Sequence, residues 1–151
     1  MDNQDIIDCL NRLVETSKDG EYGFRTSAEH VQSAPLRQLL TTRADECRQA
    51  ASELQAMIVQ NGGKPDDGGS VSGAMHRGWV AVKGKLAGYS DLAVLQECER
   101  GEDVALERYR SALEEDLPII VRTLVERQYE GVKRNHVQIR TLRDQAKATT
   151  L

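Results

Sequence analysis

Apolar residues recur every three or four positions along four long stretches of this chain, and this spacing constrains the fold more than any other feature. Such spacing places the apolar side chains on one face of an α-helix. It predicts helices over residues of about 3–32, 35–61, 91–116 and 118–145. Only 3 prolines and few aromatic residues (4 Tyr, 1 Phe and 1 Trp) argue against a β-sandwich or barrel. The 151 residues are therefore expected to form one all-α domain.

The lengths of the three connections predict how these helices lie in space. Short breaks at Ser33-Ala34-Pro35 and Leu117-Pro118 favour tight turns between antiparallel neighbours. The second and third helices are instead joined by residues 62–90, which contain a shorter helical pattern over about 71–86. A connection of this length can cross a whole bundle. We therefore expect two antiparallel helical hairpins joined by a long crossover, the connectivity of ferritin-like four-helix bundles.

Polar residues interrupt the apolar stripes near the middle of each helix. Glu21 and Glu46 are equally far from the first turn, so the two residues should share one layer. The same arithmetic about the second turn places His136 opposite Glu99, with Glu102 one helical turn away. Carboxylates from several helices together with an inward histidine suit a centre of iron or manganese. The pattern predicts a common interior region, and a candidate metal site, formed by Glu21, Glu46, Glu99, Glu102 and His136.

A purely structural role is the alternative for these acids. The complete dimetal pattern has Glu-x-x-His on two helices, but the matching stretches here are Glu46-Cys-Arg-Gln49 and Lys133-Arg-Asn-His136. An ionised carboxylate is costly to bury alone. Without a metal, at least one of these glutamates is expected to be protonated or paired with Arg43 or Arg48. Both interpretations stay open from the sequence.

Several classes of protein are disfavoured by composition. No run approaches ~18 apolar residues, so a transmembrane helix is not expected. A net charge of −4 gives no reason to expect nucleic acid or an anionic membrane as partner. The N-terminus lacks the basic and apolar regions of a secretory signal. The 3 cysteines are widely spaced and predict reduced, mostly buried thiols in a cytoplasmic protein.

Four local motifs resemble an uncharacterised bacterial family of ferritin-like four-helix-bundle proteins, known as a domain of unknown function. The resemblance covers roughly residues 4–143. It implies a ferritin-like fold and a bacterial cytoplasmic setting, and it implies no established reaction. The motifs are Lys18-Asp-Gly-Glu21, Gly62-Gly63-Lys-Pro65, Gly69-Ser-Val-Ser-Gly73 with His76-Arg77 and Trp79, and Glu97-Cys-Glu99-Arg-Gly-Glu102-Asp103.

Two functions are consistent with these features. The first is a non-catalytic bundle that acts through self-association or a protein partner, with a homodimer expected through the first helix or the crossover helix. The alternative is a protein that binds iron or manganese at the carboxylate and histidine site, for iron handling or weak oxidase activity. The sequence names no other cofactor.

Overall fold

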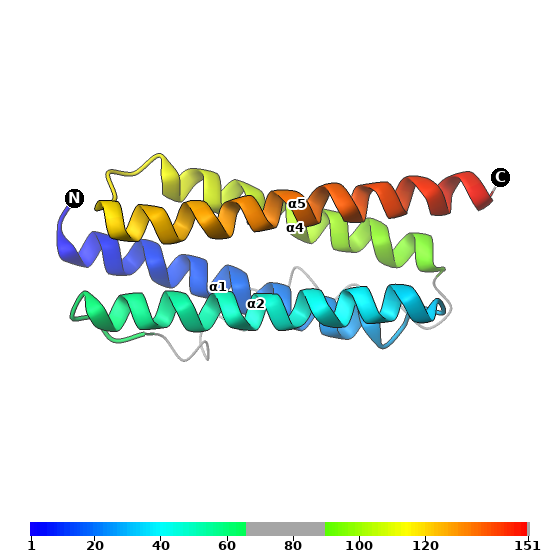
Figure 1. Ribbon diagram of the computed structural model, residues 1–151, viewed down its shortest axis with the longest axis horizontal. Helices are drawn as coiled ribbons and strands as arrows, with labels where there is room; N and C mark the ends of the chain where they lie inside the picture. The colour runs from blue at the N-terminus through cyan, green and yellow to red at the C-terminus, as the bar shows by residue number, and fades with distance from the viewer. Residues whose placement is uncertain (66–89, 151) are drawn as a thin grey trace.

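The computed structural model describes residues 1–65 and 90–150 of the chain, and these residues form four α-helices and no strand. The helices are α1 (Asn3–Ala28), α2 (Ala34–Gln60), α4 (Asp91–Leu113) and α5 (Ile119–Thr150). α1 and α2 form one antiparallel hairpin, and α4 and α5 form the other (Figure 1). The predicted all-α four-helix bundle is confirmed.

Side-chain caps begin three of the helices. Asp2, Ser33 and Ser90 each accept a hydrogen bond from a backbone N–H of the first turn of α1, α2 and α4 respectively. Such caps satisfy amides that have no partner within the helix. After α2 the chain turns through Gly62, whose φ of 79° lies in the left-handed region that favours glycine. The helix starts predicted near residues 35 and 91, and the helix end predicted near residue 61, are therefore explained by local chemistry.

The helix ends differ from the sequence expectation by a few residues. α1 ends at Ala28 rather than near residue 32, because the amides of Glu29 and His30 bond to carbonyls three residues back. α4 ends at Leu113 rather than near 116, whereas α5 continues to Thr150 rather than ending near 145. The short helix expected over 71–86 lies outside the described residues.

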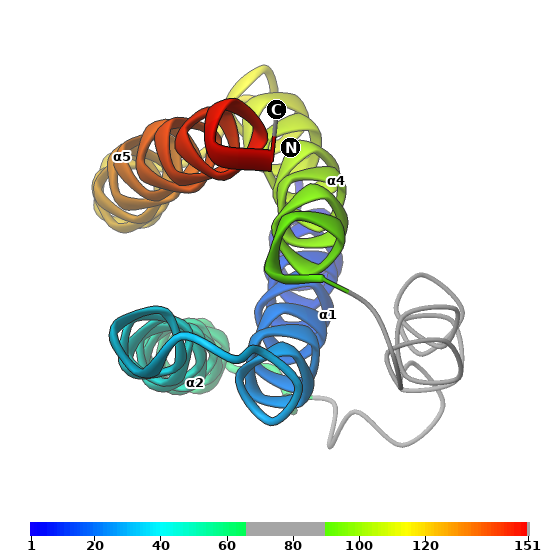
Figure 2. The same ribbon diagram turned by 90° about the vertical axis from the view of Figure 1, so that its right-hand side faces the viewer.

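The long connection links opposite ends of the bundle. α2 ends at the end of the molecule where α1 begins, and α4 begins at the far end (Figure 1). The prediction that the second and third long helices are not hairpin neighbours is confirmed. The hairpins meet mainly through α1 and α4, whereas α2 and α5 contact each other at few positions and diverge (Figure 2).

Two apolar clusters fill the bundle on either side of its centre. One contains Leu10, Leu54 and Val125, and the other contains Phe24, Leu40 and Ile139. All six side chains are buried. The polar residues described below lie between and beside these clusters, where the helices are held in place by packing on both sides.

Gly20 allows α1 and α2 to approach closely. A Cβ atom at Gly20 would lie 2.8 Å from Sγ of Cys47. We expect Gly20→Ala to lower the free energy of unfolding by about 1–2 kcal/mol, because this overlap outweighs alanine's better helix propensity. Urea unfolding of Gly20→Ala in the wild-type and Cys47→Ala backgrounds tests the cause. An equal loss in both backgrounds would contradict it.

Candidate functional site

A buried arginine lies at the centre of the candidate site. Arg43, on α2, is only 4% exposed. Its guanidinium lies 2.9 Å from a carboxylate oxygen of Glu46 and 3.7 Å from one of Glu102. Its Cζ lies 5.5 Å from the centre of the Phe24 ring, within the range of a cation–π contact. Arg43 therefore connects α1, α2 and α4 through one positive charge.

Glu102 is the most deeply buried of the predicted site residues, at 3% exposed. Neither of its carboxylate oxygens has a hydrogen-bond partner among the described residues. Burial raises the pKa of Glu102 from 4.5 to about 8, although the nearby charge of Arg43 opposes this rise. At neutral pH the protonated form of Glu102 is therefore favoured. Glu102 thus contacts Arg43, one of the two arginines that the sequence offers as partners for the inward glutamates.

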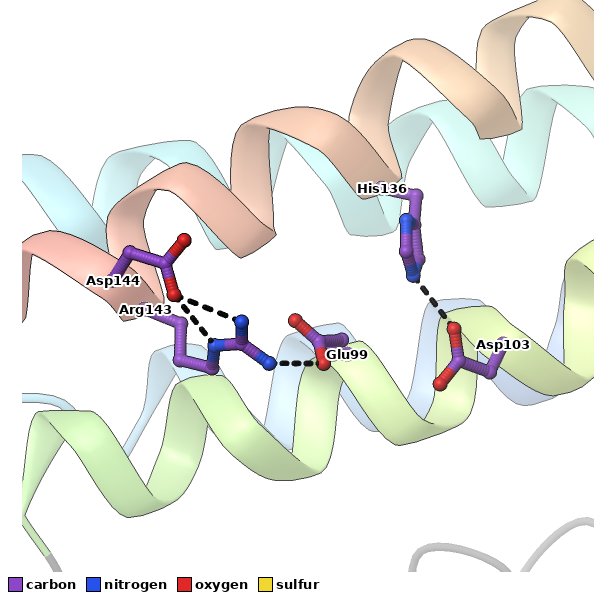
Figure 3. Close-up of polar contacts among 5 residues, drawn as sticks. All are labelled: Glu99, Asp103, His136, Arg143 and Asp144. Atoms are coloured by element: carbon purple, nitrogen blue, oxygen red, sulfur yellow. Dashed lines mark hydrogen bonds and ion pairs between the residues drawn. The ribbon is translucent and has the colours of Figure 1, made fainter. Parts of the chain in front are cut away.

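The other predicted residues pair with separate partners. Glu21 contacts Arg25 of its own helix at 3.3 Å, and the Glu46 side chain is 54% exposed. Glu99 binds Arg143, and Nε2 of His136 lies 2.6 Å from Oδ1 of Asp103 (Figure 3). Glu46 and Glu102 thus share a partner. The structure does not join Glu21, Glu99 or His136 to them.

The register of the first hairpin is the one predicted by counting residues from its turn, but the side chains of Glu21 and Glu46 do not both point into the bundle as predicted. Gly20 lies against Cys47, so the next residue on α1 and the preceding residue on α2, Glu21 and Glu46, occupy one layer. Their carboxylates are half-buried and exposed, respectively, rather than enclosed. A helix position one residue from the inward face turns by about 100°, which is enough to bring a long side chain to solvent.

The register of the second hairpin differs from the expectation. His136 lies opposite Asp103, four residues from its expected neighbour Glu99. The reason is the asymmetric turn: α4 stops at Leu113, and α5 begins beyond the end of α4 (Figure 1). Each residue of α4 therefore contacts a residue of α5 that lies nearer the C-terminal end of α5 than predicted.

The contacts of Arg43 with Glu46 and Glu102 form one polar layer of the bundle. A second polar layer joins all four helices through Tyr109. Its hydroxyl donates a 2.7 Å hydrogen bond to Oε1 of Gln128 and lies 3.4 Å from Oγ of Ser17. Nε2 of Gln128 in turn donates to the carbonyl oxygen of Ala50 and to Glu53. Ser17 and Gln128 stand on apolar stripes in the sequence, which is a signal for such a layer. Nothing in the spacing identifies Tyr109 as the residue between them.

We expect Tyr109→Phe to lower the free energy of unfolding by roughly 1–2 kcal/mol, because buried Oε1 of Gln128 loses its donor. Tyr129→Phe is the matched control, since Tyr129 stacks on Tyr109 and is only partly buried. Its loss should stay below about 0.5 kcal/mol. Chemical denaturation of both variants measures the difference. Equal losses would mean that the Tyr109 hydroxyl has no special role.

A cleft of about 610 Å³ lies between these two polar layers. All four helices contribute to its walls, and small or apolar residues form its middle, including Ala50, Ala105, Gly131 and Val132. The Arg43–Glu102 pair lines one end, and Tyr109 with Gln128 lines the other. The volume falls in the range of small-molecule sites, roughly 300–1,000 Å³.

Two further titratable groups line the cleft. Burial raises the pKa of Asp19 to about 7, with Arg108 at 4.0 Å opposing the rise. Burial also raises the pKa of the Cys47 thiol to about 12. A thiol with such a pKa is a poor nucleophile at neutral pH. Cys9 and Cys98 are also free, buried thiols.

A comparison with protein families finds a match to the domain of unknown function DUF2383 over residues 5–115. The chain belongs to this family. No curated protein matches it. None of the helices that the structure describes combines the length and the apolar character that a membrane crossing requires.

Solved structures similar to this DUF2383 protein are ferritin-like. One is a bacterioferritin-related protein of Bacteroides fragilis, described as a dodecameric thioferritin, at 16% identity, covering 99% of this chain and 91% of that chain, with a TM-score of 0.78. A Dps protein of Vibrio cholerae matches at 15% identity, 93% and 89% coverage and a TM-score of 0.75. A Dps1 mutant of Mycobacterium smegmatis matches at 16% identity, 92% and 95% coverage and 0.74. These likenesses establish the ferritin-like fold.

The description of the Vibrio cholerae protein places it among ferritin-like diiron-carboxylate proteins, which raises the question of a metal centre in this DUF2383 chain. Among residues 1–65 and 90–150, no three His, Cys, Asp or Glu residues lie close enough together to hold a metal ion. Glu46, Glu99 and Glu102 each contact an arginine instead. As arranged, these donors do not fit a dimetal centre.

Proposed function

We propose that the protein is a non-catalytic ferritin-like bundle that acts by associating with further copies of itself. The observation that carries the proposal is a group of exposed apolar side chains at one end of the bundle. Ile119 and Ile120, which begin α5, are 79% and 68% exposed. Val59 near the end of α2, and Met1 before α1, are also exposed at this end (Figure 1). Exposed apolar groups of this kind mark interaction surfaces.

A second copy of the chain is the partner that this end favours. The bacterioferritin-related protein of similar fold is described as dodecameric, so end-to-end or side contacts between such bundles are compatible with the fold. Acidic residues, among them Asp5, Asp8 and Asp116, lie around one pocket with Met1 of this group and with Arg12. Two such ends repel each other, so we expect salt to strengthen the association by screening.

Light scattering at micromolar concentration tests the proposal. We expect the wild-type protein to have a mass of two or more times 16.8 kDa. The double variant Ile119→Asp, Ile120→Asp should have a mass of 16.8 kDa. Val137→Asp is the control, because Val137 is an exposed apolar residue in the middle of α5. A wild-type mass of 16.8 kDa, or equal dissociation by both variants, would contradict this function.

Binding of iron or manganese is the second candidate, favoured by buried Glu102, whose carboxylate oxygens accept no hydrogen bond from the described residues. In this proposal Glu21, Glu46, Glu99, Glu102 and His136 would supply the ligands, after their present arginine and aspartate partners moved away. Metal analysis of protein purified without chelator or nickel resin is the test. Stoichiometric iron or manganese that is lost from the Glu99→Gln, Glu102→Gln double variant would support this candidate. Metal content at background would reject it.

A further inference from the structure

The buried end of the cleft offers both donors and acceptors that are not used. Arg43 and Glu102 line the cleft, and both are more than nine-tenths buried. Nε of Arg43 and both carboxylate oxygens of Glu102 have no hydrogen-bond partner in the part of the chain that the structure describes. Buried polar groups in proteins are normally hydrogen-bonded. Something other than these residues is therefore expected to satisfy them.

The charges at this end restrict what can bind there. A ligand carboxylate would be opposed by the carboxylate of Glu46, which lines the same cleft and already pairs with Arg43 at 2.9 Å, and a ligand ammonium would be opposed by Arg43. An uncharged head group can accept a hydrogen bond from Arg43 and donate one to Glu102, so it satisfies the unused donor and acceptor without adding a charge. A primary amide has one acceptor and two donors in this arrangement.

The middle of the cleft suits an apolar body. It lies between the two polar layers, and Ala50, Ala105 and Val132 line it with aliphatic carbon. Gly131 leaves further room, because a Cβ there would meet only Nη2 of Arg134, at an ordinary 3.6 Å. Residues of both α2 and α5 line the cleft, and these helices contact each other at few positions, so a small molecule can enter between them.

We propose that the cleft binds a small uncharged molecule, with an amide-like head between Arg43 and Glu102 and an apolar body along the middle of the bundle. This site is independent of the apolar end assigned to self-association, so either proposal can fail alone. Ordered water is the simplest competing occupant of the polar end.

Hexanamide, hexanoate and hexylamine are matched probes, since they share the apolar chain and differ in the charge of the head. Titration followed by heteronuclear NMR reports affinity and the residues that shift. We expect saturable shifts at cleft residues with hexanamide, and binding at least about tenfold weaker for the two charged probes. No saturable shift, or equal binding of all three, would overturn the proposal in favour of water alone or of unselective apolar contact.

Three variants locate the site. Glu102→Leu removes the acceptor and should weaken hexanamide binding by about tenfold or more. Glu107→Leu makes the same change at an exposed residue of the same helix that does not line the cleft, and should bind as the wild type does. Gly131→Leu fills the cleft without touching the polar pair and should also abolish binding, which keeps the test valid if Glu102→Leu folds poorly. Retained binding in Gly131→Leu would overturn the proposal.

Discussion

Replacing Arg43 with methionine is expected to lower the free energy of unfolding by roughly 2–4 kcal/mol near pH 8, the largest loss expected from any single charge in the bundle. The substitution keeps an apolar stem over Phe24 but removes the cation that faces Glu102 and Glu46. Glu102 is then either ionised without a partner or held protonated. Urea unfolding of the purified variant measures the loss.

Two controls identify the origin of this loss. Arg48→Met removes an exposed arginine from the same helix and should change the stability by less than about 0.5 kcal/mol. In the double variant Arg43→Met with Glu102→Leu, both members of the buried pair are apolar, and most of the lost stability should return. A double variant as unstable as Arg43→Met alone would mean that the arginine acts through packing rather than through Glu102.

Replacing Glu102 with glutamine is expected to raise the stability of the protein at alkaline pH. The pKa of Glu102 is about 8 in the folded chain against an ordinary 4.5, so the folded state holds a proton that the unfolded state releases over this interval. The wild type therefore loses stability as the pH rises from about 5 to 8. Glutamine cannot ionise. The advantage of the variant should grow over this interval to roughly 1–3 kcal/mol at pH 9.

Thermal and urea unfolding from pH 5 to pH 9 measure this difference. Glu46→Gln is the control, because the Glu46 carboxylate also contacts Arg43 but is exposed. This variant should lower the free energy of unfolding by up to about 1 kcal/mol rather than raise it. Stability curves of the wild type and Glu102→Gln that run parallel across this range would show that burial of Glu102 does not govern its ionisation.

The sequence predicts the helices and their connectivity well, because both depend on local signals. The spacing of apolar residues and the capping groups act within a few residues, and Ser33, Ser90 and Gly62 set helix ends close to those that the spacing predicts. α1 and α4 end three to four residues earlier than the spacing predicts, because short turns replace the last helical turn. Helix termini commonly shift by this amount.

The side chains that point into the bundle are harder to predict, because a shift of one residue along a helix turns the side-chain direction by about 100°. Glu102 lies inside, as its place on the apolar stripe predicts, and it contacts Arg43, one of the two arginines that the sequence offers as partners for the inward glutamates. Glu46 is exposed, although its layer was correct. His136 faces Asp103 because the turn between α4 and α5 is asymmetric. The spacing of apolar residues does not predict that asymmetry.

The two hairpins meet mainly along α1 and α4, and this arrangement has a mechanical consequence. A body joined along one edge rotates most easily about that edge, so the line between α1 and α4 is a natural hinge axis. Rotation about it changes the separation of α2 and α5 and leaves each hairpin intact. Ser17 and Tyr109 lie near the axis, whereas the Gln128–Glu53 hydrogen bond joins the two helices that separate. This bond, the bond from Gln128 to the Ala50 carbonyl and the Arg127–Glu53 ion pair all cross between α2 and α5, so these contacts must break before the rotation can expose the interior to solvent.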